Sequence, residues 1–145
     1  MNSIETDVHA IEELIGRRAQ ALRDRDAAAT IASQTPGYIQ DPLSGPLAYT
    51  HSPAEALAYV TDAFHGMAGP IGYEVVQQSV LVSGDLGVSH SLSRITATPT
   101  GAPAIEMWFR KTLTFTKADG RWHIAHEHES VPIGADGAAA TTLRP

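Results

Sequence analysis

Three side chains far apart in the sequence could together carry out acid–base chemistry. Asp41 precedes Pro42 at the end of a short β segment, and His126 and His128 stand one residue apart in the last β segment. Alternate residues of a strand point to the same face, so the two imidazoles lie roughly 6–7 Å apart on one side of a sheet. A carboxylate beside an apolar cavity gains proton affinity and can act as a general base.

Each of these residues also has a simpler interpretation. An aspartate before a proline is common in turns, and a histidine in a sheet can hydrogen-bond a backbone group or a neighbour such as Ser130. The two imidazoles could also ligate a metal. Zinc needs at least a third ligand, and no spacing in the sequence demands that His90 or Asp41 supply it. We therefore expect no metal.

The hydrophobic pattern predicts helices first and strands afterwards. Apolar residues recur every three or four positions over residues 3–23, which indicates a helix. Asn2 and Glu5 have the spacing of a capping box at the start of the first helix, and Ser52, Pro53 and Glu55 have the spacing of a strong helix start. Short apolar segments and these signals together predict helices over 3–23, 26–33 and 52–66 and a short strand over 38–41.

From Tyr73 the hydrophobic period changes to two, which predicts four strands, over 73–82, 86–98, 105–116 and 121–131. Helices followed by a strand meander predict an α+β fold, in which the helices pack on one face of a curved antiparallel sheet. Residues 134–145 have little to bury, so we expect one domain over residues 1–133 and a flexible tail.

The last hairpin predicts which side chains face the helices. If residues 116 and 121 pair across the turn, the opposed pairs are Trp122–Phe115, Ile124–Leu113, His126–Lys111 and His128–Phe109. Most of these pairs are apolar, which assigns this face to the core. His126 and His128 then point toward the helices, and Glu127 and Glu129 point away. His90 shares a strand face with Leu86, Val88 and Leu92 and is a further candidate for the same interior.

Two basic residues could stabilise an anionic or enolate oxygen in such an interior. Arg17 lies on the first helix, where a solvated helix face is the alternative. Lys111 stands opposite His126 and, if it points inward, needs a partner such as Asp41 or Glu106. We expect these aromatic residues to line the cavity or fill the core: Tyr38, Tyr59, Phe64, Phe109 and Trp122. Trp108 has the opposite parity to Phe109. If the helices do not cover it, it is an exposed aromatic residue on the outer sheet face, which would favour a dimer interface there.

Composition excludes several classes of protein. The 145 residues carry a net charge of −6 with no run of Lys or Arg, which argues against nucleic acid or an anionic membrane as the partner. With no cysteine there is no disulfide, thiol nucleophile or Cys-built metal site. No apolar run approaches the roughly 20 residues of a membrane span, and the polar, acidic start lacks the features of a signal peptide. We expect a cytoplasmic protein.

The order of these elements and the closing stretch over residues 110–132, with its Asp119-Gly120-Arg121-Trp122 turn, resemble the SnoaL-like and ketosteroid-isomerase-like group of the nuclear-transport-factor-like superfamily. The resemblance covers nearly the whole chain. It implies a cone-shaped roll, with the helices on the concave face of a curved mixed, mostly antiparallel sheet. It also implies a mainly apolar pocket, frequent pairing of two subunits through the outer sheet face, and no cofactor or metal.

Within that group, Gln40-Asp41-Pro42 resembles the site of the catalytic Asp of ketosteroid isomerases. The oxyanion donors of those enzymes are absent, because their first-helix Tyr falls on Arg17 and their late-strand Asp falls near Lys111 or Thr112. The resemblance to SnoaL-type cyclases and scytalone dehydratases, which use Asp and His, is closer.

The function expected from the sequence is therefore a cofactor-independent acid–base catalyst, of the isomerase, cyclase or dehydratase type, acting on a small, mostly apolar carbonyl compound in an enclosed pocket. Asp41 would be the base or would orient a histidine, and His126 would shuttle the proton, helped by His128 or His90. The alternative is a non-catalytic small-molecule-binding or dimerising module, because a fold alone does not determine function.

Overall fold

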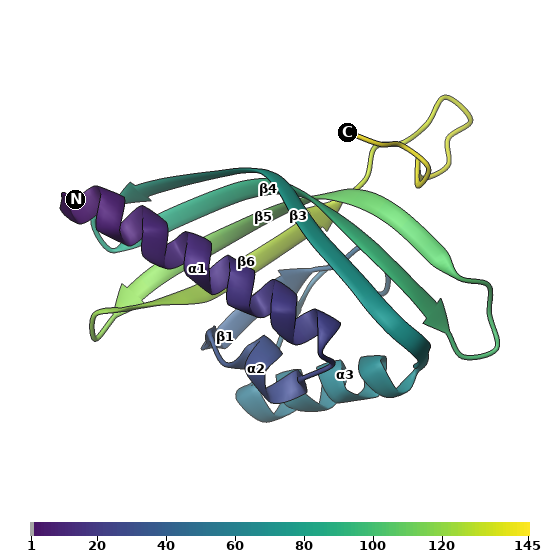
Figure 1. Ribbon diagram of the computed structural model, residues 1–145, viewed down its shortest axis with the longest axis horizontal. Helices are drawn as coiled ribbons and strands as arrows, with labels where there is room; N and C mark the ends of the chain where they lie inside the picture. Colours follow the sequence, from purple (N-terminus) through teal and green to yellow (C-terminus); the bar gives the residue numbers. More distant parts are fainter. Residues whose placement is uncertain (1) are drawn as a thin grey trace.

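The elements follow the predicted order, with three helices and a short strand ahead of a meander of long strands (Figure 1), except that the two-residue strand Tyr49–Thr50 was not predicted. The computed structural model describes residues 2–145. The helices are α1 (Ser3–Arg23), α2 (Ala27–Ile31) and α3 (Pro53–His65), and the strands are β1 (Gln34–Asp41), β2 (Tyr49–Thr50), β3 (Met67–Ser83), β4 (Leu86–Pro99), β5 (Ile105–Ala118) and β6 (Arg121–Ser130). Within these residues no helix is both long and apolar enough to cross a membrane.

The two longer helices begin at the predicted caps. Asn2 and Glu5 form a reciprocal capping box, in which the Glu5 amide donates to Asn2 Oδ1 over 2.9 Å and the Asn2 amide donates to Glu5 Oε2 over 2.8 Å. Ser52 and Glu55 form the same arrangement ahead of Pro53. These bonds satisfy amide groups that the first turn leaves without intrahelical partners.

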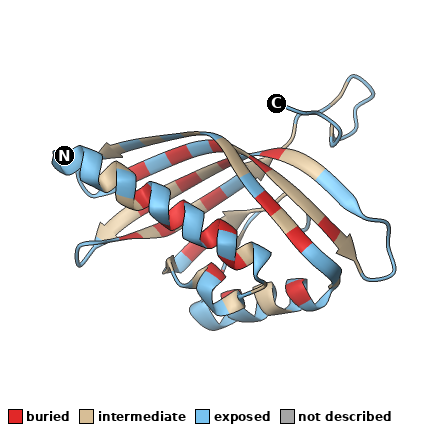
Figure 2. Cartoon of the chain, viewed as in Figure 1, coloured by how far each residue is buried: buried red, intermediate tan, exposed pale blue. Residues whose placement is uncertain are grey.

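The six strands form one sheet in the order β2-β1-β6-β5-β4-β3. Only β1 and β6 run parallel, and every other neighbouring pair is antiparallel. The sheet curves around α1, whose buried side faces it, while α2 and α3 lie below the C-terminal half of α1 in the view shown (Figures 1 and 2). The predicted fold class, helices on the concave face of a mixed, mostly antiparallel sheet, is confirmed.

The main core lies between α1 and the centre of the sheet. Ile11, Leu14 and Ile15 of α1 pack on a set of buried sheet residues: Tyr38, Leu113, Phe115, Trp122 and Ile124. Two smaller clusters continue the core toward α3, one around Phe109 and Tyr73 and one around Phe64 and Ile71. Tyr38, Phe64, Phe109 and Trp122 are thus core residues, one of the two environments that the sequence predicted for them.

The predicted register of the last hairpin is wrong for two reasons: the turn is tighter than the prediction assumed, and a β-bulge follows it. The turn is the two-residue Asp119–Gly120, with positive φ at both positions, so Ala118 pairs with Arg121. The register then shifts by one residue between Thr114 and Phe115. A one-residue shift moves every later side chain to the other face of the sheet.

As a result, Trp122 and Ile124 face the helices as predicted, but the side chains after them point to the opposite face from the one predicted. Glu127, which is only 1% exposed, points inward, and His126 and His128 point to the outer face, paired with Thr114 and Thr112. The prediction that the imidazoles face the helices is therefore wrong.

The predicted face of β4 is also wrong. Its inward residues are small, namely Gly87, Ser89, Ser91 and Ser93, whereas Leu86, Val88 and His90 are exposed on the outer face. The reason is the close approach of α1: a Cβ atom on Gly87 would lie 2.7 Å from Ile11 Cδ1. The large apolar side chains of α1 occupy the space that larger β4 side chains would need.

The outer face of the sheet carries apolar side chains near the β3–β4 turn, with Leu81 72% and Leu86 60% exposed. The tail covers the other end of that face, because Arg144 forms a 2.7 Å ion pair with Glu106, and Leu143 and Trp108 line the same hollow. The outer position of Trp108 is confirmed. Pairing of two copies through this face and flexibility of residues 134–145 stay predictions.

Adding a methyl group at Gly87 should destabilise the fold. We expect Gly87→Ala to lower the free energy of unfolding by about 1–3 kcal/mol, because the new Cβ overpacks the fully buried Ile11. Urea denaturation of Gly87→Ala, of Ile11→Val and of the double variant measures the effect. The loss of unfolding free energy in the double variant should be smaller than the sum of the losses in the two single variants. Gly37→Ala is the control, since nothing lies within 4 Å of its Cβ position.

Candidate functional site

The three residues that the sequence singled out do converge, on the outer face of the sheet. Asp41 Oδ2 lies 2.7 Å from His126 Nε2 and 3.3 Å from His128 Nδ1. The parallel pairing of β1 with β6 sets Asp41 directly beside His128. The side chains are 26%, 34% and 51% exposed, respectively. The hydrogen bond to His126, joined by that to His128, lowers the pKa of Asp41, so this carboxyl favours the charged form.

These three residues therefore lie on the opposite side of the sheet from the helices, which corrects the predicted enclosed acid–base site. Their catalytic roles stay untested. His90 is exposed on the same outer face and pairs with Thr112, so β5 separates it from His128. The ligating atoms of Asp41, His126 and His128 all lie within 4.8 Å of one another, close enough for one divalent cation to bind them together.

Arg17 does not face the interior. Its side chain is 71% exposed and lies 3.9 Å from Glu13, its nearest ionic partner on the same helix. Arg18, the next residue, is 8% exposed and points under the helix. The sequence contained a signal for this, because Arg18 stands three positions after Ile15 and seven after Ile11, on the apolar stripe of α1.

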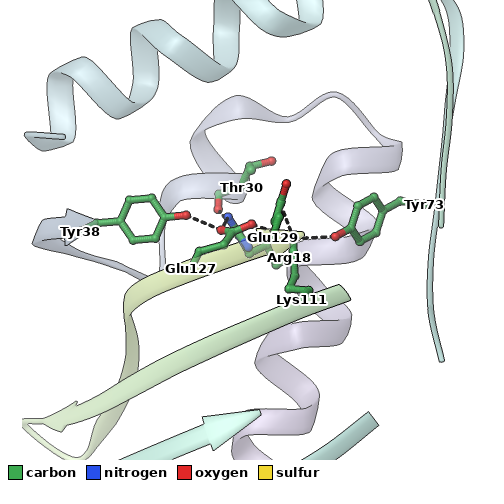
Figure 3. A network of polar contacts seen from close by, with 7 residues as sticks. All are labelled: Arg18, Thr30, Tyr38, Tyr73, Lys111, Glu127 and Glu129. Carbon is green, nitrogen blue, oxygen red and sulfur yellow. Dashed lines mark hydrogen bonds and ion pairs between the residues drawn. The ribbon is translucent and has the colours of Figure 1, made fainter. Parts of the chain in front are cut away.

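Under the helices, Glu127 is the centre of a buried polar network (Figure 3). Its Oε2 accepts from Arg18 Nη2 over 2.6 Å and from the Tyr38 hydroxyl. Its Oε1 lies 2.8 Å from Lys111 Nζ. Arg18 Nε also donates to the backbone oxygen of Thr30 over 3.4 Å. The network thus joins α1, α2, β1, β5 and β6.

Lys111 points inward, as predicted, but its partners differ from those expected. Its ammonium donates to the Tyr73 hydroxyl over 2.6 Å and lies 3.3 Å from Glu129 Oε1 as well as near Glu127. Asp41 is engaged on the other face, and Glu106 pairs with Arg94 and Arg144. The bulge explains the error, because it brings two glutamates of β6 to the face of Lys111.

The two glutamates of the network differ in proton affinity. Burial alone would raise the pKa of Glu127, but the charges of Arg18 and Lys111 outweigh it and hold that pKa well below its usual range. Burial raises the pKa of Glu129 to about 7, and the Glu127 charge adds to this while Lys111 opposes it. At neutral pH, Glu127 is ionised and Glu129 is divided between its two forms.

The interior around this network is nearly full. The void beside Lys111, Tyr73 and Arg18 measures about 10 Å³, close to the smallest space that a single water occupies. Tyr59 is 42% exposed and packs edge-on against Tyr49 and near the buried His51. It does not line the void beside Lys111.

A larger hollow lies on the other side of α1, where α1, α2 and the start of β6 meet. This groove of about 580 Å³ is lined by Arg17, Arg18, Arg121 and His123, by Trp122, and by small or apolar residues of α1 and α2. Sequence reasoning did not find it, because its two walls belong to segments about a hundred positions apart.

Comparison with known proteins agrees with this architecture. The SnoaL-like domain family matches residues 11–134, and the chain belongs to that family. No curated protein sequence matches it.

Solved structures extend the comparison. A NTF2-like protein of unknown function from Pseudomonas putida KT2440 is 27% identical, with 97% of this chain and 98% of that chain covered and a TM-score of 0.85. A ketosteroid isomerase-like protein from Erwinia carotovora atroseptica SCRI1043 is 20% identical, with 90% and 97% covered and a TM-score of 0.73. A nuclear transport factor 2 superfamily protein from Salmonella enterica is 15% identical, with 90% and 94% covered and a TM-score of 0.77. The last two show the fold alone.

Removing the charge of Glu127 should destabilise the protein strongly. We expect Glu127→Gln to lower the free energy of unfolding by about 3–5 kcal/mol, because it leaves Arg18 and Lys111 buried without full compensation. Chemical denaturation measures this. The control is Glu74→Gln, which breaks the partly exposed pair with Arg94 and should cost less than about 1 kcal/mol.

Glu129 should make stability depend on pH. Because its pKa is about 7 in the folded protein against the usual 4.5, the folded state binds this proton more tightly than the unfolded chain does. The stabilisation is complete below pH 4.5 and is lost as the pH rises through 7. Relative to Glu129→Gln, the wild type should therefore lose free energy of unfolding across this window. Parallel pH profiles for the two proteins in urea denaturation would contradict the assignment.

Proposed function

We propose that this SnoaL-like protein binds a small organic anion in the groove between α1, α2 and the start of β6. The observation that carries the proposal is the groove itself, which measures about 580 Å³ and is lined by three arginines and no carboxylate side chain. Pockets for small organic ligands commonly measure roughly 300–1,000 Å³.

The charge of the groove is opposite to that of the protein as a whole. The chain has a net charge of −6 and only 10 Lys and Arg residues, yet Arg17, Arg18 and Arg121 all line this one hollow. Arg121 is exposed and has no ion pair within residues 2–145. A concave surface of one charge sign raises the local concentration of ligands of the other sign.

Arg18, although paired with Glu127, gives the groove a fixed guanidinium at its floor. It is 8% exposed, and its Nε and Nη2 are engaged by Thr30 and Glu127. Those contacts hold the guanidinium plane in place, and no hydrogen bond to residues 2–145 engages Nη1. A guanidinium nitrogen that is not engaged by the protein can donate to a carboxylate of a ligand.

The remaining lining favours a ligand that also has an apolar part. Ala10 and Leu14 of α1, Ala29 and Ala32 near α2, and Trp122 of β6 all border the groove. Burial of apolar surface supplies most of the binding free energy of small ligands, while a few polar groups orient them. A small aromatic or aliphatic carboxylate fits this combination.

Acid–base catalysis on a small carbonyl compound, the other function expected from the sequence, has less support. Its proposed residues, Asp41, His126 and His128, lie on the outer face, and the void beside Lys111 measures only about 10 Å³. Binding in the groove needs neither an enclosed cavity nor those side chains. A cytoplasmic location and a homodimer through the outer sheet face stay predictions.

Binding can be followed on the two tryptophans of the chain. In a titration with benzoate and hexanoate, monitored by ¹H–¹⁵N NMR, we expect the indole signal of Trp122 in the groove to shift with saturation and that of Trp108 on the outer face to stay. Arg121→Gln should weaken binding about tenfold, since a hydrogen bond to a charged group contributes about 1.5 kcal/mol or more.

Two controls distinguish recognition of the anion from nonspecific binding. Benzamide has the shape of benzoate without its charge and should bind at least about tenfold more weakly. Arg110→Gln removes an exposed arginine that contacts Ser130 on the outer face and should leave the affinity unchanged. Equal affinity for benzamide, or no saturable shift at Trp122 with either carboxylate, would refute the proposal.

A further inference from the structure

The cluster of Asp41, His126 and His128 on the outer sheet face has no role in the groove, and its geometry points to another ligand. We propose that these three side chains bind a divalent transition-metal ion of the zinc type. The inference is independent of anion binding, because the cluster and the groove share no residue.

The donor atoms already surround a common point. His126 Nε2 and His128 Nδ1 lie 2.7 and 3.3 Å from the same oxygen of Asp41, and all three ligand atoms lie within 4.8 Å of one another. Zinc bonds of about 2.0–2.2 Å place neighbouring tetrahedral ligands roughly 3.3–3.6 Å apart. Small side-chain rotations therefore suffice to admit an ion.

The backbone that carries the ligands is fixed. Asp41 and His128 are direct partners in the parallel ladder of β1 and β6, and Ile39 is the partner of His126. On its other side β6 is paired with β5, so both histidines stand on an inner strand of the sheet. Ligands on paired strands lose little freedom when an ion binds, which favours affinity.

The donor set selects the class of ion. Calcium and magnesium prefer oxygen ligands, whereas two imidazoles with one carboxylate suit zinc and the neighbouring ions cobalt, nickel and copper. The cluster is partly exposed, so water can complete the coordination, as in sites with three protein ligands.

Charge also favours a cation here. In residues 2–145 no Lys or Arg nitrogen lies within 4.0 Å of Asp41, and its only charged or ionisable partners are the two imidazoles. The neighbours of the histidines on β5 are the uncharged Thr112 and Thr114. The Asp41 charge is now offset only by hydrogen bonds from the two imidazoles. A bound divalent cation would take the place of these bonds and would coordinate the carboxylate directly.

The test is a titration of the tag-free full-length chain with Co²⁺, followed by its visible absorption, and then with Zn²⁺ as competitor. We expect a single saturable site whose spectrum indicates nitrogen and oxygen ligands and disappears as Zn²⁺ displaces Co²⁺. Asp41→Asn and His126→Gln should each weaken Co²⁺ binding by about tenfold or more, since even outer-shell changes cost that much at metal sites.

The control comes from the same face of the sheet. His90→Gln removes a histidine that lies outside the cluster, and this variant should bind Co²⁺ as the wild type does. Absence of a saturable site, or a site that survives Asp41→Asn and His126→Gln, would overturn the proposal.

If an Asp41 or His126 variant does not fold, as judged by circular dichroism, NMR of the wild type decides. Addition of Zn²⁺ should shift the signals of His126 Nε2 and His128 Nδ1 and leave those of the His90 ring unchanged. Signals that do not move, or that move equally in all three rings, would reject the site.

Discussion

One extra residue in β6 determines what each face of this protein can do. Ile124 and Glu127 are three positions apart in one strand, yet both face the helices, which an uninterrupted strand does not allow. The register shift opposite Thr114 and Phe115 makes this geometry possible. It turns the carboxylates of β6 toward the interior and its imidazoles toward the outside, so the network and the proposed metal site follow from the same feature.

The inward carboxylate is tolerated only because cations from other elements reach it. An isolated buried charge would cost several kcal/mol, but Glu127 receives Arg18 from α1 and Lys111 from β5. Such contacts depend on direction more than apolar packing does, so they fix how α1 sits on the sheet. The same requirement holds the Arg18 guanidinium at the floor of the groove, which links the stability of the interior to the proposed anion site.

The sequence was sufficient wherever local chemistry decides the outcome. The capping boxes at Asn2 and Ser52, the helical period of α1 and the change to period two at the long strands predicted the elements and the fold. Side-chain direction was less accessible. A bulge has no reliable signature in the sequence of β6, and the small inward residues of β4 are explained only by the approach of Ile11. The inward direction of Arg18 could have been predicted, because this residue lies on the apolar stripe of α1.

The sequence predicted that Asp41 and two histidines come together to act in catalysis. They do come together, but on the open outer face of the sheet, which suits coordination of a metal ion better. An acid–base group needs a substrate held against it and shielded from water, and an open sheet face offers neither. A metal site needs donor atoms at fixed separations and tolerates water in its remaining positions. The same three residue types therefore support different chemistry on the two faces of one sheet, and only their placement distinguishes the two. Since similarity at 15–20% identity shows the fold alone, function in this family has to be argued from that placement, residue by residue.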